Sequence, residues 1–236
     1  ELKAVVGGEW KMKVGPQEMT GGWRMEETKH FYFFSNLRPD LHAFFKNEIE
    51  LFYNQIASIM QYKEGDPLWN NKCPVYYISK RSQFATFTSR IDKSAGAYNS
   101  GGYFMHEGRE CHIVIPLYDM YPDNFQKREA TNTLYHEGTH AFLQLCGNDV
   151  TINSWLHEGT AQFVEFFKDP QNNSGRNNNV ALLRDRIRSG DLMTWEEGKM
   201  RPMGGGDLEG YAFAWSRVQF IYSCFPKDYL PKIIRE

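Results

Sequence analysis

Apolar residues recur along this chain at spacings that predict helices in some segments and strands in others. After Pro39-Asp40, large apolar side chains recur at steps of four, three, four and three residues, which places them on one face of a helix. These positions are Phe45, Ile49, Phe52, Ile56 and Ile59. Two short apolar runs, residues 29–34 and 74–78, are rich in aromatic and β-branched residues. They predict buried strands before and after that helix.

The next segment predicts a hairpin and an edge strand, followed by a helix. Gly96-Ala97-Tyr98 leads into a turn at Ser100-Gly101-Gly102, and an apolar run follows at residues 111–115. Residues 133–145 then keep a helical apolar rhythm. Gly147-Asn148 stands where such a helix would terminate.

The C-terminal part predicts more helices, separated by a polar loop. One helix contains Trp155 and ends at Asp169-Pro170, and the loop after it is expected to continue through Asn179. Two more helices are expected near residues 180–188 and 211–223. Strands followed by helices, rather than alternating with them, indicate an α+β domain.

The helix at residues 133–145 contains His136-Glu137-Gly138-Thr139-His140, an HExxH sequence. Residues four apart lie on the same face of a helix, so His136 and His140 can present two imidazole nitrogens to one metal ion. A catalytic zinc ion usually has three protein ligands and one open position. Glu158, on the following helix, is the natural third ligand. The alternative is an amphipathic helix whose histidines are satisfied by ordinary hydrogen bonds.

Two motifs together resemble the gluzincin branch of the zinc metallopeptidases, most closely the peptidase-MA-like domain family. The segments that carry the resemblance are residues 134–141, LYHEGTHA, and residues 154–163, SWLHEGTAQF. In that family an HExxH helix precedes a WLxEGxA helix whose Glu is the third zinc ligand. The resemblance therefore implies a single zinc ion held by His136, His140 and Glu158, with Glu137 as the general base. It covers about residues 28–236.

The same resemblance suggests roles for two further residues. Gly210-Tyr211-Ala212-Phe213-Ala214-Trp215 is similar to the family's Tyr-x-x-x-Trp segment, which makes Tyr211 the candidate donor to the developing oxyanion. An ordinary half-buried aromatic is the alternative. Gln162 stands where members of the family often carry an acid, so its amide oxygen is expected to accept the outer N–H of a ligand histidine. His157 is expected at the start of its helix, outside the ligand set and either beside a ligand or at the surface.

Composition and charge limit the function classes. With 41% hydrophobic residues in 236, the chain can bury one sizeable core, and no segment is a linker long enough to divide it. We expect a lead-in segment or hairpin at residues 1–27 and a single domain at 28–236. Its predicted fold is α+β, with a small mixed or antiparallel sheet whose edge strand lies above the zinc-binding helix, followed by a gluzincin-like helical part.

A formal net charge of -2 argues against a nucleic-acid surface, and no apolar stretch approaches the roughly 20 residues of a membrane span. The chain begins Glu1-Leu2-Lys3 without an initiator Met, which weakly favours a secreted or extracytoplasmic protein whose targeting segment is not in this sequence. Cys73, Cys111, Cys146 and Cys224 have no metal-binding spacing. They allow three full disulfide pairings among which the sequence does not choose, and free buried thiols are the alternative.

The expected substrate is a peptide or protein, bound along the edge strand as an added strand at Gly96, Ala97 and Tyr98. A plain structural turn at these residues is the alternative, because Gly-rich hairpins are common. Gluzincin aminopeptidases carry a Gly-x-Met-Glu-Asn segment at this place, whose Glu holds the free amine of the substrate. Residues 96–99 contain no Glu, which favours an endopeptidase. Two alternatives stay open: a metal-bearing binding or scaffold domain without turnover, and a zinc hydrolase of a non-peptide bond.

Overall fold

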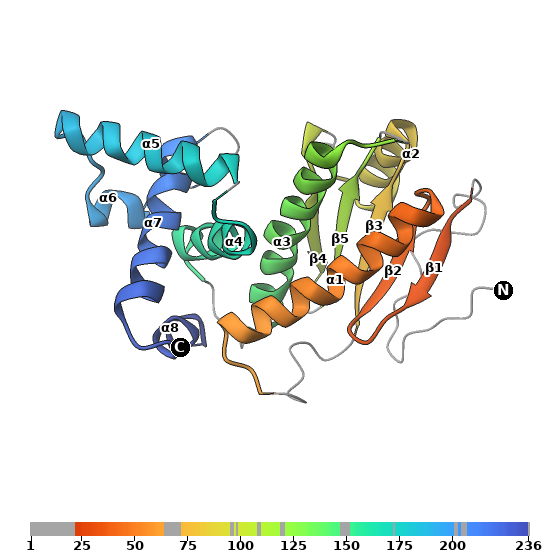
Figure 1. Ribbon diagram of the computed structural model, residues 1–236, viewed down its shortest axis with the longest axis horizontal. Helices are drawn as coiled ribbons and strands as arrows, with labels where there is room; N and C mark the ends of the chain where they lie inside the picture. The colour runs from red at the N-terminus through yellow and green to blue at the C-terminus, as the bar shows by residue number, and fades with distance from the viewer. Residues whose placement is uncertain are drawn as a thin grey trace. The chain divides into compact units, whose positions relative to one another are not determined.

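The computed structural model describes residues 22–63, 72–94, 97, 99–107, 110–118, 121–146, 152–171, 173–200, 203 and 207–235. The chain forms two compact units. Residues 1–53 and 69–134 make up one of them, called here the sheet unit because it holds every strand that the structure describes. Residues 54–68 and 135–236 make up the other, the helical unit. Figure 1 shows the elements of both.

The sheet unit is built on five strands in the order β1-β2-β3-β5-β4. Their bounds are β1 (Arg24–Glu27), β2 (Phe31–Ser35), β3 (Cys73–Ile78), β4 (Tyr103–Glu107) and β5 (Glu110–Pro116). β2, β3 and β5 are parallel, whereas β1 and β4 pair antiparallel at the two edges. The fold is therefore α+β with a small mixed sheet. β1 lies within the predicted lead-in segment, and residues 1–21 lie outside the described residues.

Helix α1 (Pro39–Ile59) begins in the sheet unit, where the first part of the predicted apolar stripe packs on one face of the sheet. Phe45 stacks on Tyr77 of β3 at 4.3 Å between ring centroids, and Phe52 meets Phe31 of β2 at 6.4 Å. All five stripe positions named above are buried, which confirms the helix and its orientation. The two strands predicted from apolar runs are confirmed as β2 and β3.

The other face of the sheet is covered by two elements that the periodicity did not predict. They are α2 (Arg81–Thr86) and the π-helical turn η1 (Phe87–Ile91), whose Phe84 and Phe87 join the core of that face. Asp92 follows this turn and is buried. Its Oδ2 accepts a hydrogen bond from the Tyr103 hydroxyl at 2.6 Å and lies 2.9 Å from Nε2 of His112.

Parallel pairing of β3 and β5 brings two of the four cysteines together. Cys73 and Cys111 are buried free thiols whose Sγ atoms lie 3.7 Å apart. Cys224 is a free thiol at the surface. Among the described residues the structure therefore has Cys73 and Cys111 as neighbouring free thiols, which was one of the two states that the sequence left open.

The helical unit contains the end of α1, α3 from residue 135 on and, among the residues that the structure describes, five more helices. The bounds are α3 (Asn124–Cys146), α4 (Ser154–Lys168), α5 (Ser174–Ser189), α6 (Trp195–Met200), α7 (Leu208–Cys224) and α8 (Tyr229–Arg235). α4 and α7 pack so closely that a Cβ on Gly159 of α4 would lie 2.5 Å from the carbonyl oxygen of Ala214 of α7. No helix that the structure describes is long and apolar enough to cross a membrane.

The polar loop expected to continue through Asn179 is shorter than predicted. α5 begins at Ser174, because the side chain of Asn173 accepts a hydrogen bond from the backbone N–H of Arg176 and caps the helix. Asn179 is a buried helical residue whose amide donates to Gln162 Oε1 at 2.9 Å. The prediction of a loop here was wrong, since a polar segment became helical through its cap and one buried amide contact.

Candidate metal centre

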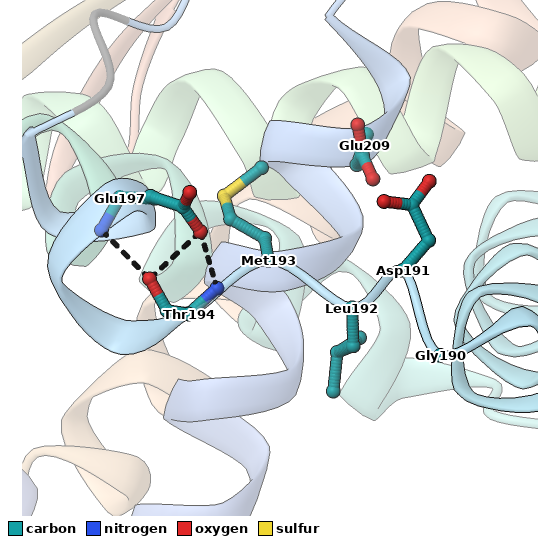
Figure 2. A pocket seen from close by; sticks show the side chains of 7 residues that line it. All are labelled: Gly190, Asp191, Leu192, Met193, Thr194, Glu197 and Glu209. Atoms are coloured by element: carbon teal, nitrogen blue, oxygen red, sulfur yellow. Dashed lines mark hydrogen bonds between the residues drawn. The ribbon is translucent and has the colours of Figure 1, made fainter.

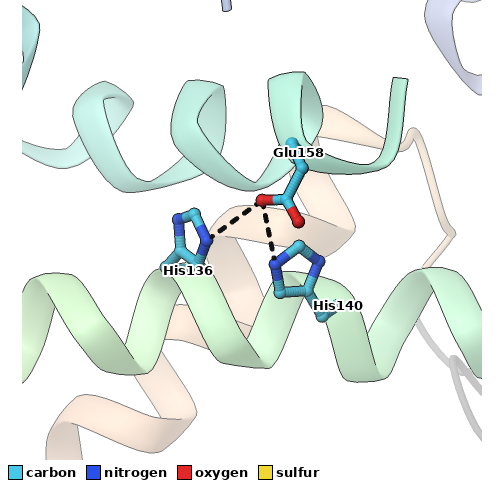
Figure 3. A group of neighbouring side chains, drawn as sticks. All are labelled: His136, His140 and Glu158. Atoms are coloured by element: carbon cyan, nitrogen blue, oxygen red, sulfur yellow. Dashed lines mark ion pairs between the residues drawn. The ribbon is translucent and has the colours of Figure 1, made fainter. Parts of the chain in front are cut away.

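His136 and His140 lie one turn apart on α3 and point to the same side of that helix (Figure 3). Their ring centroids are 4.8 Å apart and the ring planes are nearly perpendicular, at 85°. His140 is buried and His136 is half-buried. The sequence spacing is therefore realised as two converging imidazoles, as the HExxH motif predicted.

Glu158 approaches both rings from the second turn of α4 (Figure 3). Its Oε2 lies 3.5 Å from Nε2 of His136 and 3.4 Å from Nε2 of His140. The candidate ligand atoms of the three residues all lie within 4.8 Å of one another. These three side chains form a group that could hold a metal ion, and they are the three that the sequence selected.

The electrostatics of this group favour a carboxylate beside a charged imidazole when no ion is bound. Burial lowers the pKa of His136, but contacts with Glu158 and Glu165 and the nearby charge of Glu137 outweigh it and hold that pKa well above its usual value. Burial raises the pKa of Glu158, whereas its contacts with His136 and His140 outweigh burial and hold that pKa far below its usual value. Glu158 is therefore ionised at neutral pH, as a metal ligand must be.

The outer nitrogen of His136 faces a residue that the sequence analysis did not single out. Nδ1 of His136 lies 3.2 Å from Oε2 of Glu165, also on α4. The expectation that Gln162 would accept this hydrogen bond was wrong, because Nδ1 of His136 faces Glu165 and Nδ1 of His140 has no hydrogen-bond partner among the described residues. Gln162 Oε1 accepts from Asn179. The helical repeat could have predicted this contact, because Glu165 follows Glu158 by seven residues. That spacing is about 20° short of two full turns, so both carboxylates lie on the same face of α4.

His140 is held differently. Its Nδ1 is buried without a hydrogen-bond partner in the part of the chain that the structure describes. Its ring is stacked on the ring of His157, with centroids 4.5 Å apart and planes 7° from parallel. His157 was expected at the start of its helix, outside the ligand set and either beside a ligand or at the surface, and its ring packs against the candidate ligand His140.

Tyr211 lies close enough to Glu158 and Glu137 for their charges to affect its pKa. Burial raises the pKa of the Tyr211 phenol to about 12, with further contributions from the charges of Glu158, Glu137 and Asp207. Tyr211 is therefore a neutral hydrogen-bond donor at physiological pH. It sits in the first turn of α7, whose start is capped by the Asp207 side chain accepting from the N–H of Gly210 at 3.1 Å.

The chain matches no protein-family model and no curated protein sequence. What can be said of its chemistry therefore depends on the two motifs and on the geometry of this group.

The predicted substrate strand differs from what the structure describes. Ala97 lies in a turn, where its N–H donates to the carbonyl of Ser94 and its carbonyl accepts from Ser100. Gly96 and Tyr98 lie outside the described residues. The strand at this edge of the sheet is β4, which begins at Tyr103.

A pocket of about 630 Å³ in the helical unit contains none of the candidate ligands (Figure 2). Three acids line it, and each has a structural partner. Asp191 and Glu209 both pair with Arg186, at 2.7 and 3.0 Å. Glu197 and Thr194 exchange hydrogen bonds in a capping box that starts α6. These acids therefore have partners of their own, and the only group among the described residues that could hold a metal ion is the one formed by His136, His140 and Glu158.

Proposed function

We propose that this chain is a zinc metallopeptidase of the gluzincin type. In this proposal His136 and His140 bind one zinc ion through Nε2, Glu158 binds it through Oε2, and Glu137 is the general base. Two imidazoles and a carboxylate form one of the three-ligand sets of catalytic zinc. The proposal is supported by the convergence of these residues from two different helices.

The observation that carries the proposal is the spacing of the ligand atoms. The 3.4 and 3.5 Å separations between Glu158 Oε2 and the two Nε2 atoms exceed the roughly 2.7–2.9 Å of a charge-assisted hydrogen bond. Oε2 is also buried without a hydrogen-bond partner among the described residues. A tetrahedral ion with ligands at about 2.0–2.1 Å separates neighbouring ligand atoms by about 3.3–3.4 Å. These two separations fit atoms that share an ion, and the candidate ligand atoms of all three residues lie within 4.8 Å of one another.

The surrounding residues fit peptide hydrolysis. Bound zinc would activate a water molecule and polarise the scissile carbonyl. Glu137 would take the proton of the attacking water and deliver it to the leaving amine. Tyr211, neutral and close to the same charges, would donate a hydrogen bond to the developing oxyanion. The lack of a Glu at residues 96–99 favours internal cleavage over removal of N-terminal residues.

Metal analysis and a peptide-library digest test the proposal together. The purified protein should contain about one zinc per chain, and Glu158→Ala should lose most of it, because a catalytic site needs three protein ligands. The matched control is Glu196→Ala, which removes an exposed carboxylate paired with Lys199 on α6 and should leave zinc content unchanged. Full zinc occupancy in Glu158→Ala would remove Glu158 from the site and end the gluzincin assignment.

Glu137→Gln separates metal binding from chemistry. The amide keeps the shape of the side chain but cannot take a proton, so zinc should stay bound while hydrolysis is abolished. A Gln variant that cleaves library peptides as fast as the parent would refute the general-base role. Zinc binding with no cleavage in the parent itself would favour a metal-bearing binding domain, or a hydrolase of another bond.

A further inference from the structure

The two candidate ligand histidines are oriented by different means. A ligand imidazole needs its ring plane fixed so that its lone pair points at the ion, and this is usually done by a hydrogen bond to the outer nitrogen. His136 has such a contact, from Nδ1 to Glu165. The corresponding Nδ1 of His140 is buried and has no hydrogen-bond partner among the described residues. Something other than an outer hydrogen bond must therefore set the plane of His140.

The ring of His157 is the contact that meets this need. It lies almost parallel to the His140 ring, with the planes 7° apart and the centroids at 4.5 Å. His136 cannot serve in this way, because its ring meets His140 edge-on at 85°. His157 precedes Glu158 directly, and its backbone N–H donates to the carbonyl of Asn153 at the start of α4. The same turn of α4 therefore holds the candidate ligand Glu158 and the His157 ring that stacks on the other candidate ligand, His140.

We propose that His157 is a positioning residue of the metal centre, which sets the ring plane of His140 by stacking rather than by ligation. This inference rests on the proposed zinc site. Without the stack, the His140 ring can rotate about its Cβ–Cγ bond. Binding of the ion stops this rotation, which costs conformational entropy. The metal therefore binds more weakly without the stack, although the same three residues bind it.

The test compares His157→Ala, His157→Phe and His157→Leu by the zinc dissociation constant, measured in competition with a chromophoric chelator. Aromatic pairing of this kind corresponds to about a 2- to 12-fold change in affinity. The Ala and Leu variants should therefore bind zinc about 2- to 12-fold more weakly than the parent. The Phe variant keeps a flat ring without nitrogens and should bind within about 2-fold. Cobalt-substituted parent and Phe variant should share one visible absorption spectrum, and the Ala variant should differ.

The matched control is His106→Ala, which removes an exposed histidine stacked on Phe104 in β4 and should not change zinc affinity. Unchanged affinity in both Ala and Leu variants would overturn the proposal. Equal weakening in Phe and Ala would also overturn it, because a ring nitrogen of His157 would then be the active feature. If Ala does not fold, Phe and Leu give the same decision. A parent that binds no zinc would instead refute the proposed function itself.

Discussion

The packing of α4 on α7 makes a quantitative prediction for Gly159→Ala. Gly159 follows the candidate ligand Glu158 directly, and its missing side chain allows α7 to approach. A Cβ at this position would lie 2.5 Å from the carbonyl oxygen of Ala214, 2.7 Å from its carbonyl carbon and 2.9 Å from a methyl group of Val218. Two of these three atoms belong to the backbone of a helix, so they cannot move aside by changing rotamer.

The expected cost follows from these distances. Ordinary van der Waals contact begins at 3.4 Å, so the two helices would have to separate by about 0.9 Å at this point. Overpacking of this kind costs about 1–3 kcal/mol, and a rigid neighbour places the cost near the upper end. Ala is a better helix former than Gly by about 1 kcal/mol, which offsets part of it. The net destabilisation should be about 2 kcal/mol, or a fall of about 4–8 °C in thermal midpoint.

Differential scanning calorimetry of Gly159→Ala measures this shift. Zinc affinity should fall as well, because the separation displaces the turn that carries Glu158. Gly101→Ala is the matched control, since the nearest atom to its Cβ would be Thr133 Oγ1 at 4.0 Å, and its midpoint should not fall. A midpoint for Gly159→Ala equal to or above that of the parent would refute the close packing of α4 on α7.

Three more predictions follow from the site and its supports. Tyr211→Phe should lower turnover by about 10- to 1000-fold with zinc content unchanged, whereas intact turnover with a lower thermal midpoint would assign Tyr211 to packing. Glu165→Gln should weaken zinc binding by about 10- to 100-fold, and Gln162→Ala should not; the reverse order would restore the assignment of Gln162. Asn173→Ala removes the side-chain oxygen that accepts a hydrogen bond from the Arg176 N–H and caps α5. The free energy of unfolding should fall by about 1 kcal/mol, measured by calorimetry as a lower thermal midpoint. An unchanged midpoint would mean that the cap is not needed.

Local patterns in the sequence were sufficient for α1, for the part of α3 that carries the HExxH motif, and for the three candidate ligands. The spacing of Phe45, Ile49 and Phe52 predicted both α1 and its buried face, because a helix turns by the same angle at every residue. His136 and His140 converge for the same reason. Such inferences need no knowledge of neighbouring elements. Short elements such as α2 and α6 were missed, because few residues give no measurable period.

Contacts between elements were decided only in the tertiary structure. The offset between α3 and α4 determines that Glu165 faces His136 and that His157 stacks on His140, and no period within one helix contains that offset. Strand order likewise decides that Cys73 and Cys111 are neighbours, although they are far apart in the chain. Local spacing in the sequence therefore predicts which residues form the candidate metal centre. It does not predict which contacts orient each candidate ligand, because these depend on the rotation and offset of one packed helix against another.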